Sequence, residues 1–302
     1  MIEITASRVK TLREQTGVGM MECKKALQEA DGDLKRAATL LREKGEAKAV
    51  KRASRATNEG RIQGKVREDE RACVLVEVNV ETDFAARNDR FAKLVDRVAD
   101  AALVCRCSSP EALLRAKPEG IDAESVEALV TEAIGVIGEN IGISRCECLE
   151  VPEGKSGLVH TYVHPPGSVG VAVALDCESD EVARTEAARE LAHNLCLHIA
   201  FSNPAGLDSD SIPQDVIEAE REVYRNAAIK QGKPEKILDK IVEGRLRAFF
   251  KESCLLEQAY VKEEQKSVKQ LIDEAAKTAG GAVKVKRYVR CQLGEAAVDA
   301  DA

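Results

Sequence analysis

The fold is decided by the stretch Val74-Leu75-Val76-Glu77-Val78-Asn79-Val80-Glu81-Thr82-Asp83-Phe84. Its valines occupy every second position and share one face of a predicted strand, while Leu75, Glu77 and Asn79 share the other face. Glu81-Thr82-Asp83 ends the strand, and Phe84 follows immediately. Because the chain has only 5 Phe and no Trp, an aromatic residue at a strand-to-helix turn needs a specific reason.

A second copy of this pattern occurs 97 residues further along the chain. Gly60–Val66 resembles Gly157–Val163 (157 − 60 = 97). At the same offset, Glu81-Thr82-Asp83 corresponds to Glu178-Ser179-Asp180, and Phe84 corresponds to Glu181. Agreement of strands and turns at one fixed offset predicts a duplicated unit of two strands, a short polar turn and a long helix.

Each copy is expected to close with a third strand. Asn88 and Thr185, again 97 residues apart, are the predicted N-caps of the two long helices. An amphipathic helix and an alternating strand follow, with the strands at 143–151 and 283–291. Each copy therefore predicts a three-stranded antiparallel sheet with helices on one face, which places the protein in the α+β class.

The segments around the duplicated core predict further units. Three short helices are expected in the first 45 residues, with Thr5 and Asp33 as N-caps of the first and third. Helical patterns on both sides of Gly232-Lys233-Pro234 predict an antiparallel hairpin. The predicted domains are a three-helix module at 1–45, a basic linker at 46–59, a first core repeat at 60–152, a second core repeat at 153–294 with the hairpin inserted at 213–252, and a disordered tail at 295–302.

The basic linker has two interpretations. Its cations Lys48, Lys51, Arg52 and Arg55 belong either to a solvated, semi-helical linker or to a contact with an acidic partner or RNA. Together with Lys284-Val285-Lys286-Arg287 they support a second hypothesis, RNA binding that is lost steeply with salt. The net charge of −7 and the aromatic content of 3% argue against it, so no stable nucleic-acid binding is expected.

Motifs for catalysis, cofactor binding and membrane insertion are missing from the sequence. No glycine-rich phosphate loop follows a strand and no Gly-x-Ser-x-Gly occurs, so we expect neither an enzyme nor a cofactor. The 10 cysteines lack metal-ligand spacing, and His193 and His198 lie five apart on one helix, which predicts no metal site. We expect reduced thiols, with Cys146 and Cys148 as small core residues of one strand. Neither an apolar run of about 18 residues nor a signal peptide is present, so we expect a cytoplasmic protein without membrane contact.

Three stretches of the chain resemble the translation elongation factor Ts family. They are Leu12–Leu27 (LREQTGVGMMECKKAL), Asn79–Ala85 (NVETDFA), and Gly232-Lys233-Pro234 followed by Val242–Arg245 (VEGR). The similarity covers about residues 1–294. The order of parts also agrees, because the family combines a three-helix UBA-like module, a duplicated core and an inserted helical hairpin.

The resemblance implies a guanine-nucleotide exchange factor for elongation factor Tu in the elongation phase of protein synthesis. In that family the segment matching Thr82, Asp83, Phe84 and Ala85 enters the GTPase domain of the partner. There it disturbs the site that holds Mg²⁺ and the nucleotide phosphates, and GDP leaves. The implied partners are the GDP-bound and the nucleotide-free forms of elongation factor Tu.

The N-terminal module is implied to grip another face of the same domain through positions matching Arg13, Met20 and Met21. The second half of the core is implied to contact a β-barrel domain. Longer family members end in an additional C-terminal helix, which this sequence is expected to lack, and a homodimer through the hairpin is left open. The alternative for Phe84 is packing on its own helix, but Glu181 at the matching position indicates that the scaffold needs no aromatic residue there.

Overall fold

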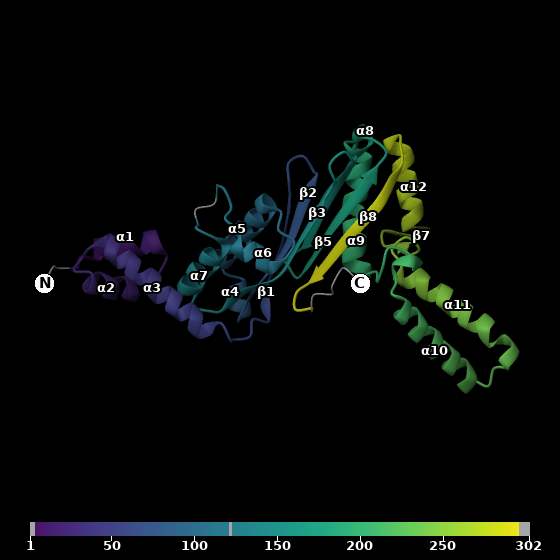
Figure 1. The fold of residues 1–302 in the computed structure, drawn as a ribbon, viewed down its shortest axis with the longest axis horizontal. Coiled ribbons are helices and arrows are strands. Elements are labelled where there is room, and N and C mark those ends of the chain that lie inside the picture. The colour runs from purple at the N-terminus through teal and green to yellow at the C-terminus, as the bar shows by residue number, and fades with distance from the viewer. Residues whose placement is uncertain (1–3, 121–122, 296–302) are drawn as a thin grey trace.

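The computed structural model describes residues 4–120 and 123–295 and shows an α+β fold, as predicted. A helical N-terminal region, two sheets and a projecting helical hairpin follow one another along the longest axis (Figure 1). The strands are β1 (Glu59–Val66), β2 (Ala72–Val80), β3 (Ile141–Glu150), β4 (Gly157–His164), β5 (Val169–Cys177), β6 (Ala259–Tyr260), β7 (Glu263–Ser267) and β8 (Val283–Gln292). The α-helices are α1 (Ala6–Thr16), α2 (Met20–Glu29), α3 (Leu34–Arg52), α4 (Asp83–Ala86), α5 (Asp89–Cys105), α6 (Pro110–Arg115), α7 (Val126–Ile137), α8 (Asp180–Ala183), α9 (Glu186–Ser202), α10 (Gln214–Lys230), α11 (Glu235–Ser253) and α12 (Val268–Ala279), and a 3-10 turn, η1, spans Ser209–Ser211.

The N-terminal helices begin at the predicted caps. The side-chain oxygen of Thr5 accepts from the Arg8 backbone N–H, and that of Asp33 accepts from the Arg36 N–H. Leu12 and Leu27 are fully buried between the three helices. Helix α3 does not end near residue 45 but continues to Arg52, so the first part of the predicted linker is helical. The division into domains remains a prediction.

The N-terminal helices pack directly on the first repeat. Helices α3 and α7 approach closely at two glycines, since a Cβ on Gly135 would lie 3.1 Å from the Gly45 Cα. The side chain of Val136 packs against the core of the N-terminal helices. A guanidinium nitrogen of Arg90 on α5 donates to the Gly17 carbonyl at 2.6 Å. The loop between α1 and α2 is therefore attached to the start of α5.

The two sheets have the same topology and nearly the same details. Their strand orders are β1-β2-β3 and β4-β5-β8, and all pairs are antiparallel. The register of the central strand shifts between Glu77 and Val78 in the first sheet and between Ala174 and Leu175 in the second, again 97 residues apart (174 − 77). The alternate valines of β2 pack beneath α5 and α7 in one core cluster, as the alternation predicts.

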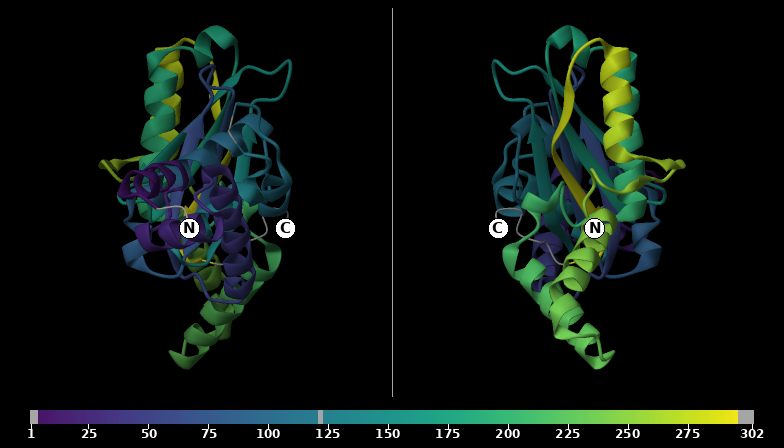
Figure 2. Two further views of the ribbon diagram at one scale, coloured as in Figure 1. Left: turned by 90° about the vertical axis from the view of Figure 1, so that its left-hand side faces the viewer. Right: turned by 90° about the vertical axis from the view of Figure 1, so that its right-hand side faces the viewer.

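The other face of β2 is covered by the second sheet. Leu75 and Ile62 share a core cluster with Val159 and Ala172, so the sheets pack face to face with helices on the outside (Figure 2). Helix α5 lies over the first sheet, and α9 and α12 lie over the second. The result is four layers, helix, sheet, sheet and helix, with β2 buried on both faces.

The inserted hairpin leaves the core next to the second sheet. Helices α10 and α11 pack on each other, and the side chains of Leu238, Val242 and Leu246 are buried between them. The pair projects away from the body (Figure 1). Of the predicted tail, residues 296–302 lie outside the described residues, and Glu295 lies at their edge.

The thiols follow the expected pattern. All ten cysteines are free, and Cys146 is buried in the first core cluster with Cys148 packed against it. Among residues 4–120 and 123–295, no group of three or more His, Cys, Asp or Glu side chains is arranged to hold a metal ion. No helix in the same ranges is long and apolar enough to cross a membrane.

Candidate functional site

The segment Thr82–Ala86, here called the tip, is a single helical turn that presents Phe84. The Thr82 hydroxyl oxygen accepts from the Ala85 backbone N–H at 3.2 Å and so begins α4 directly after β2. Ala85 and Ala86 are buried against the first core cluster. Between these anchors the Phe84 side chain is 84% exposed. An exposed Phe forfeits about 1.5–3 kcal/mol of burial free energy, so packing does not explain this residue.

The tip is fixed at both ends by side chains from other elements. Glu139, just after α7, accepts from the Thr82 backbone N–H at 3.0 Å and from the Thr82 hydroxyl at 2.8 Å. At the other end, Arg61 on β1 donates from Nε to the Ala86 carbonyl at 2.7 Å. These bonds leave the backbone around Phe84 little freedom to move.

Glu81 connects the start of the tip to the linker. The Asn140 backbone N–H donates to its carboxylate at 2.6 Å, and Arg55 lies 3.2 Å away as its ion-pair partner. These contacts hold the pKa of Glu81 below its usual value, and the hydrogen bond from the Asn140 backbone contributes most. The Asn140 amide also donates to the Arg55 carbonyl. Lys48 pairs with Glu22, so two cations of the predicted basic linker contact acids of their own chain.

Asp83 in the tip makes only a weak internal contact. Its carboxylate lies 3.4 Å from the Arg87 guanidinium in an exposed pair one helical turn apart. Exposed pairs of this kind contribute about 0–1 kcal/mol. A partner could replace this ion pair at little cost.

The second repeat carries the same turn without the same attachments. Helix α8 begins after Ser179, whose hydroxyl oxygen accepts from the Val182 N–H, and Glu181 is exposed at the position of Phe84. Glu178 accepts from the Ala282 N–H, as Glu81 does from Asn140. Where the first repeat has Arg61 and Glu139, however, the second has Leu158 and Gly281.

The second group of predicted site residues lies on the N-terminal helices. Arg13 is exposed in the last turn of α1, and Met20 and Met21 are exposed in the first turn of α2. Arg90, in the first turn of α5, donates to the Gly17 carbonyl in the loop between α1 and α2. The two groups of predicted residues belong to different elements.

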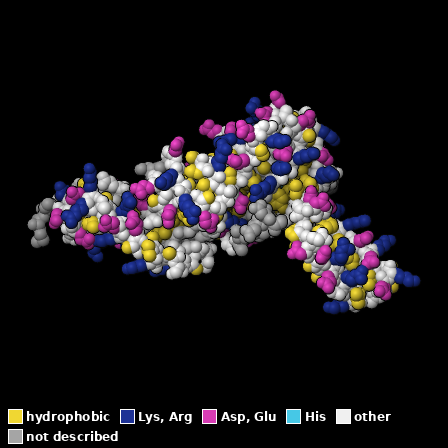
Figure 3. Space-filling view, in the orientation of Figure 1, with side chains coloured by type: hydrophobic (Ala, Val, Ile, Leu, Met, Phe, Trp, Pro, Cys, Tyr) yellow, Lys and Arg dark blue, Asp and Glu magenta, His cyan; other side chains and the backbone are white. Residues whose placement is uncertain are grey.

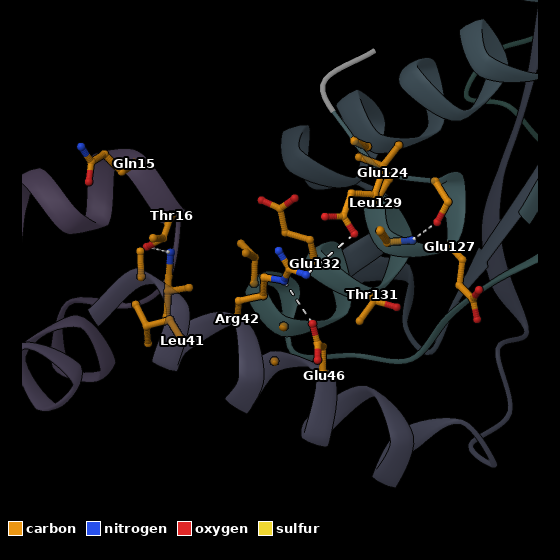
Figure 4. A pocket seen from close by; sticks show the side chains of 18 residues that line it. Gln15, Thr16, Leu41, Arg42, Glu46, Glu124, Glu127, Leu129, Thr131 and Glu132 are labelled. Atoms are coloured by element: carbon orange, nitrogen blue, oxygen red, sulfur yellow. Dashed lines mark hydrogen bonds and ion pairs between the residues drawn. The ribbon is translucent and has the colours of Figure 1, made fainter. Parts of the chain in front are cut away.

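A cleft separates the N-terminal helices from α7, and it contains none of the predicted site residues (Figure 4). Its volume is about 900 Å³, and Arg42 spans it between Glu46 at 3.2 Å and Glu124 at 3.9 Å. Its charged lining is mostly acidic, with Glu127 and Glu132 added to these two. Acidic and basic side chains are interspersed on the face of the molecule in Figure 3, and hydrophobic side chains are exposed on the projecting hairpin.

Glu139 and Arg61 are contacts of the site that sequence reasoning missed. Glu139 lies 57 residues from Thr82 and Arg61 lies 25 residues from Ala86, so no local pattern indicates them. One signal was available, because Gly138-Glu139-Asn140 in the first repeat corresponds to Gly280-Gly281-Ala282 in the second. The two copies therefore differ at this position, where a Cβ on Gly281 would lie 2.6 Å from the Val182 side chain.

Comparison with known proteins identifies the family to which the chain belongs. A family model described as Elongation factor TS matches residues 81–295, which include the tip and most of both repeats. Proteins named Elongation factor Ts from a Nitratiruptor species, Lawsonia intracellularis and Clostridium botulinum are 44%, 42% and 43% identical. Each alignment spans 97% of this chain, and they span 93%, 100% and 93% of the respective relatives. The chain therefore belongs to the elongation factor Ts family and has a role in translation elongation.

Proposed function

We propose that this protein is a guanine-nucleotide exchange factor for elongation factor Tu and acts in the cytoplasm. It binds the GDP-bound and nucleotide-free forms of the GTPase and displaces the elements that hold Mg²⁺ and the nucleotide phosphates. The observation that carries the proposal is Phe84, an 84% exposed aromatic side chain on a turn that is fixed at both ends. Family membership supports the same conclusion.

The physical mechanism is differential binding to two states of the partner. Mg²⁺ bridges phosphate oxygens and switch residues of a GTPase, so displacing those residues weakens the hold on GDP. A factor that binds the nucleotide-free state more tightly must weaken nucleotide binding by the same factor. Burial of Phe84 in the partner supplies free energy for this displacement, and no bond of any substrate is made or broken. The protein is therefore a binding factor and not an enzyme.

The N-terminal helices supply a second contact in this proposal. Met21 is 66% exposed, and Met20 precedes it at the start of α2. Flexible methionine side chains suit a surface that must adapt to a partner. Arg13 adds a positive charge to the same group of helices. We propose that these residues hold the GTPase while the tip enters its nucleotide site.

The experiment measures release of fluorescent GDP from elongation factor Tu of the same organism, with catalytic amounts of the factor and excess unlabelled GDP. Fast release is expected with the unaltered protein. Phe84→Ala should slow it at least about 30-fold, because an anchor residue is worth about 2 kcal/mol or more. Val104→Ala is the control, since Val104 is also exposed, at 56%, but lies at the end of α5 in the first repeat, far from the tip in sequence. Unchanged release with the unaltered protein would exclude the exchange function.

A second arm of this experiment tests the N-terminal contact. Replacing Met20 and Met21 together by Ala should raise the factor concentration needed for half-maximal exchange about three- to tenfold, with a smaller effect on the maximal rate. Val50→Ala on α3 is the control, because Val50 is exposed and is not in the proposed contact. Equal effects of both changes would remove Met20 and Met21 from the site.

We propose, as a separate point, that the hairpin allows self-association. Val216 and Val223 are exposed on α10 seven residues apart, which places them on one face of the helix. Burial against a second hairpin would remove this apolar surface from water. Sedimentation of the purified chain distinguishes the outcomes, because a monomer at micromolar concentration contradicts the proposal.

A further inference from the structure

The contacts of the tip fall into two groups when the repeats are compared. One group occurs in both copies. It comprises the hydroxyl cap of the helical turn and the carboxylate of Glu81 or Glu178, which accepts from the backbone N–H of the residue before the third strand. The other group occurs only in the first copy and consists of Glu139 on Thr82 and Arg61 on Ala86. The second group is therefore not needed to build the turn.

We propose that Glu139 and Arg61 are positioning residues that hold the tip in its partner-binding conformation. The structural alternative is that they only stabilise the fold. Helix α8 argues against that alternative, because it has the same length as α4 and buried Val182 and Ala183 although Leu158 and Gly281 replace the two residues. The extra contacts lie only in the copy that carries the exposed Phe.

The arrangement of Glu139 explains how it acts. One carboxylate oxygen accepts a hydrogen bond from the Thr82 backbone N–H at 3.0 Å, and the other accepts one from the Thr82 hydroxyl at 2.8 Å. The Thr82 hydroxyl must therefore point its hydrogen at Glu139 and its lone pair at the Ala85 N–H, 3.2 Å away. Bonds to an ionised acceptor are stronger than neutral ones. The orientation of the first turn of α4, and of Phe84 within it, is fixed in this way.

Arg61 fixes the other end of the same turn. Its Nε donates to the Ala86 carbonyl at 2.7 Å, which is a C-terminal carbonyl of α4 without an intrahelical partner. A turn held at both ends does not lose conformational freedom again when it binds. The expected consequence is a higher maximal exchange rate and not a tighter first encounter, because the rigid tip is needed when the nucleotide site is disturbed.

The inference rests on the proposed exchange function and is tested in the same assay. Glu139→Gln keeps the size of the side chain but offers one acceptor oxygen instead of two. We expect the maximal exchange rate to fall about fivefold, the equivalent of one net hydrogen bond of about 1 kcal/mol. The concentration for half-maximal exchange should change less than twofold. Arg61→Leu, which introduces the residue found at Leu158, should act in the same direction.

A double-mutant cycle separates positioning from folding. In a Phe84→Ala background, Glu139→Gln should have no further effect on exchange, because no aromatic side chain is left to position. The matched control is Ser179→Ala, which removes a cap from α8 and should lower thermal stability without slowing exchange. Thermal melting of every variant reports the folded fraction.

The outcomes distinguish this inference from the proposed function. If Phe84→Ala exchanges normally, the role of the tip itself is wrong. If Phe84→Ala is slow while Glu139→Gln and Arg61→Leu exchange like the unaltered protein, only the positioning role is wrong. The positioning role is also overturned if Glu139→Gln slows exchange by the same factor with and without Phe84.

Discussion

The two repeats of the core have nearly the same backbone but carry different turns. Strands β2 and β5, turns α4 and α8, and helices α5 and α9 begin and end 97 residues apart (169 − 72, 180 − 83, 186 − 89). The closing helix and strand of each repeat share a second offset of 142 residues (268 − 126, 283 − 141). The repeats differ where Phe84 is replaced by Glu181 and Glu139 by Gly281.

This difference separates scaffold from site. Contacts that occur in both repeats, such as the caps and the buried β2 and β5 residues, are required by any copy of the fold. Contacts that occur in one repeat require another reason, and in the first repeat two of them, Glu139 with Thr82 and Arg61 with Ala86, hold one helical turn. A duplicated protein thus provides its own control for assigning function to individual residues.

The largest effect is expected from exchanging the two tips. Phe84→Glu makes the first tip resemble the second and should reduce exchange about 100-fold or more, since it removes an apolar anchor and adds a charge that must lose its water. Adding Glu181→Phe to this variant should not restore exchange, because the second tip lacks Glu139 and Arg61 equivalents. GDP release from elongation factor Tu measures both effects.

Stability provides the control for this exchange of residues. Both positions are exposed, so neither substitution should change the free energy of unfolding by more than about 0.5 kcal/mol. Recovery of exchange by Glu181→Phe would show that either repeat can serve as the site. In that case the comparison of the two turns would no longer explain the function.

Local features of the fold were predictable from the sequence. The caps Thr5, Asp33, Asn88 and Thr185 all accept the expected backbone N–H groups in the structure. A cap depends on residues two or three positions away, so a single sequence contains the whole signal. The duplication was predictable for the same reason, because it repeats caps, turns and strands at one spacing.

Packing between distant segments was not predictable in the same way. Glu77 and Asn79 are polar residues on the other face of β2, yet they are only 1% and 5% exposed. The second sheet covers them, and their polarity is accommodated by a hydrogen bond between the Asn79 amide and Glu77 and by the Gly294 N–H on the same carboxylate. That last contact spans 217 residues, so no local pattern reveals it.

The candidate site likewise has one part that local sequence indicates and another that depends on distant segments. Composition, the duplicated pattern and family resemblance single out Phe84, and in the structure its side chain is exposed. The residues that hold the tip come from β1 and from the turn after α7, and only the folded chain brings them to Thr82 and Ala86. Helix α3, which continues to Arg52, packs on α7 where its Gly45 lies against Gly135, a contact between distant segments that no local pattern indicates.

A smaller effect, on the pH dependence of stability, is expected from a buried histidine in the second repeat that has no counterpart in the first. His198 on α9 is fully buried, and the matching position in α5 is Ala101. Its Nδ1 accepts from the Val261 N–H at 3.2 Å, so its Nε2 carries the hydrogen and donates to the Gln258 side-chain oxygen at 2.9 Å. Ser202 and the Tyr260 ring lie beside it. Burial lowers the pKa of His198 because the charged form would lose its water.

The direction of the pH effect follows from this lowered pKa. The unfolded chain takes up a proton on His198 below about pH 6.5, whereas the folded chain resists, so stability falls as the pH decreases from there. Between pH 7.5 and 5.5 the unaltered protein should lose up to about 1 kcal/mol more unfolding free energy than His198→Gln. Burial, and then His193, also lower the pKa of His160, which remains in both proteins and cancels in the difference. Equal pH dependence in urea denaturation would contradict this account.

The smallest effect on exchange is expected from the N-caps of α5 and α9, because each repeat has such a cap. The Asn88 side chain accepts from the Arg90 N–H at 2.8 Å, and the Thr185 hydroxyl oxygen accepts from the Ala188 N–H at 3.2 Å. Asn88→Ala should cost about 1 kcal/mol of unfolding free energy, and Thr185→Ala should cost up to about 1 kcal/mol more, because the Thr185 hydroxyl also donates to the Val182 carbonyl at 2.7 Å. Neither should slow exchange, although Asn88 lies only four residues after Phe84. If Asn88→Ala slowed exchange as much as Glu139→Gln, proximity to the tip would matter more than whether a contact is shared, and the separation of scaffold from site would fail.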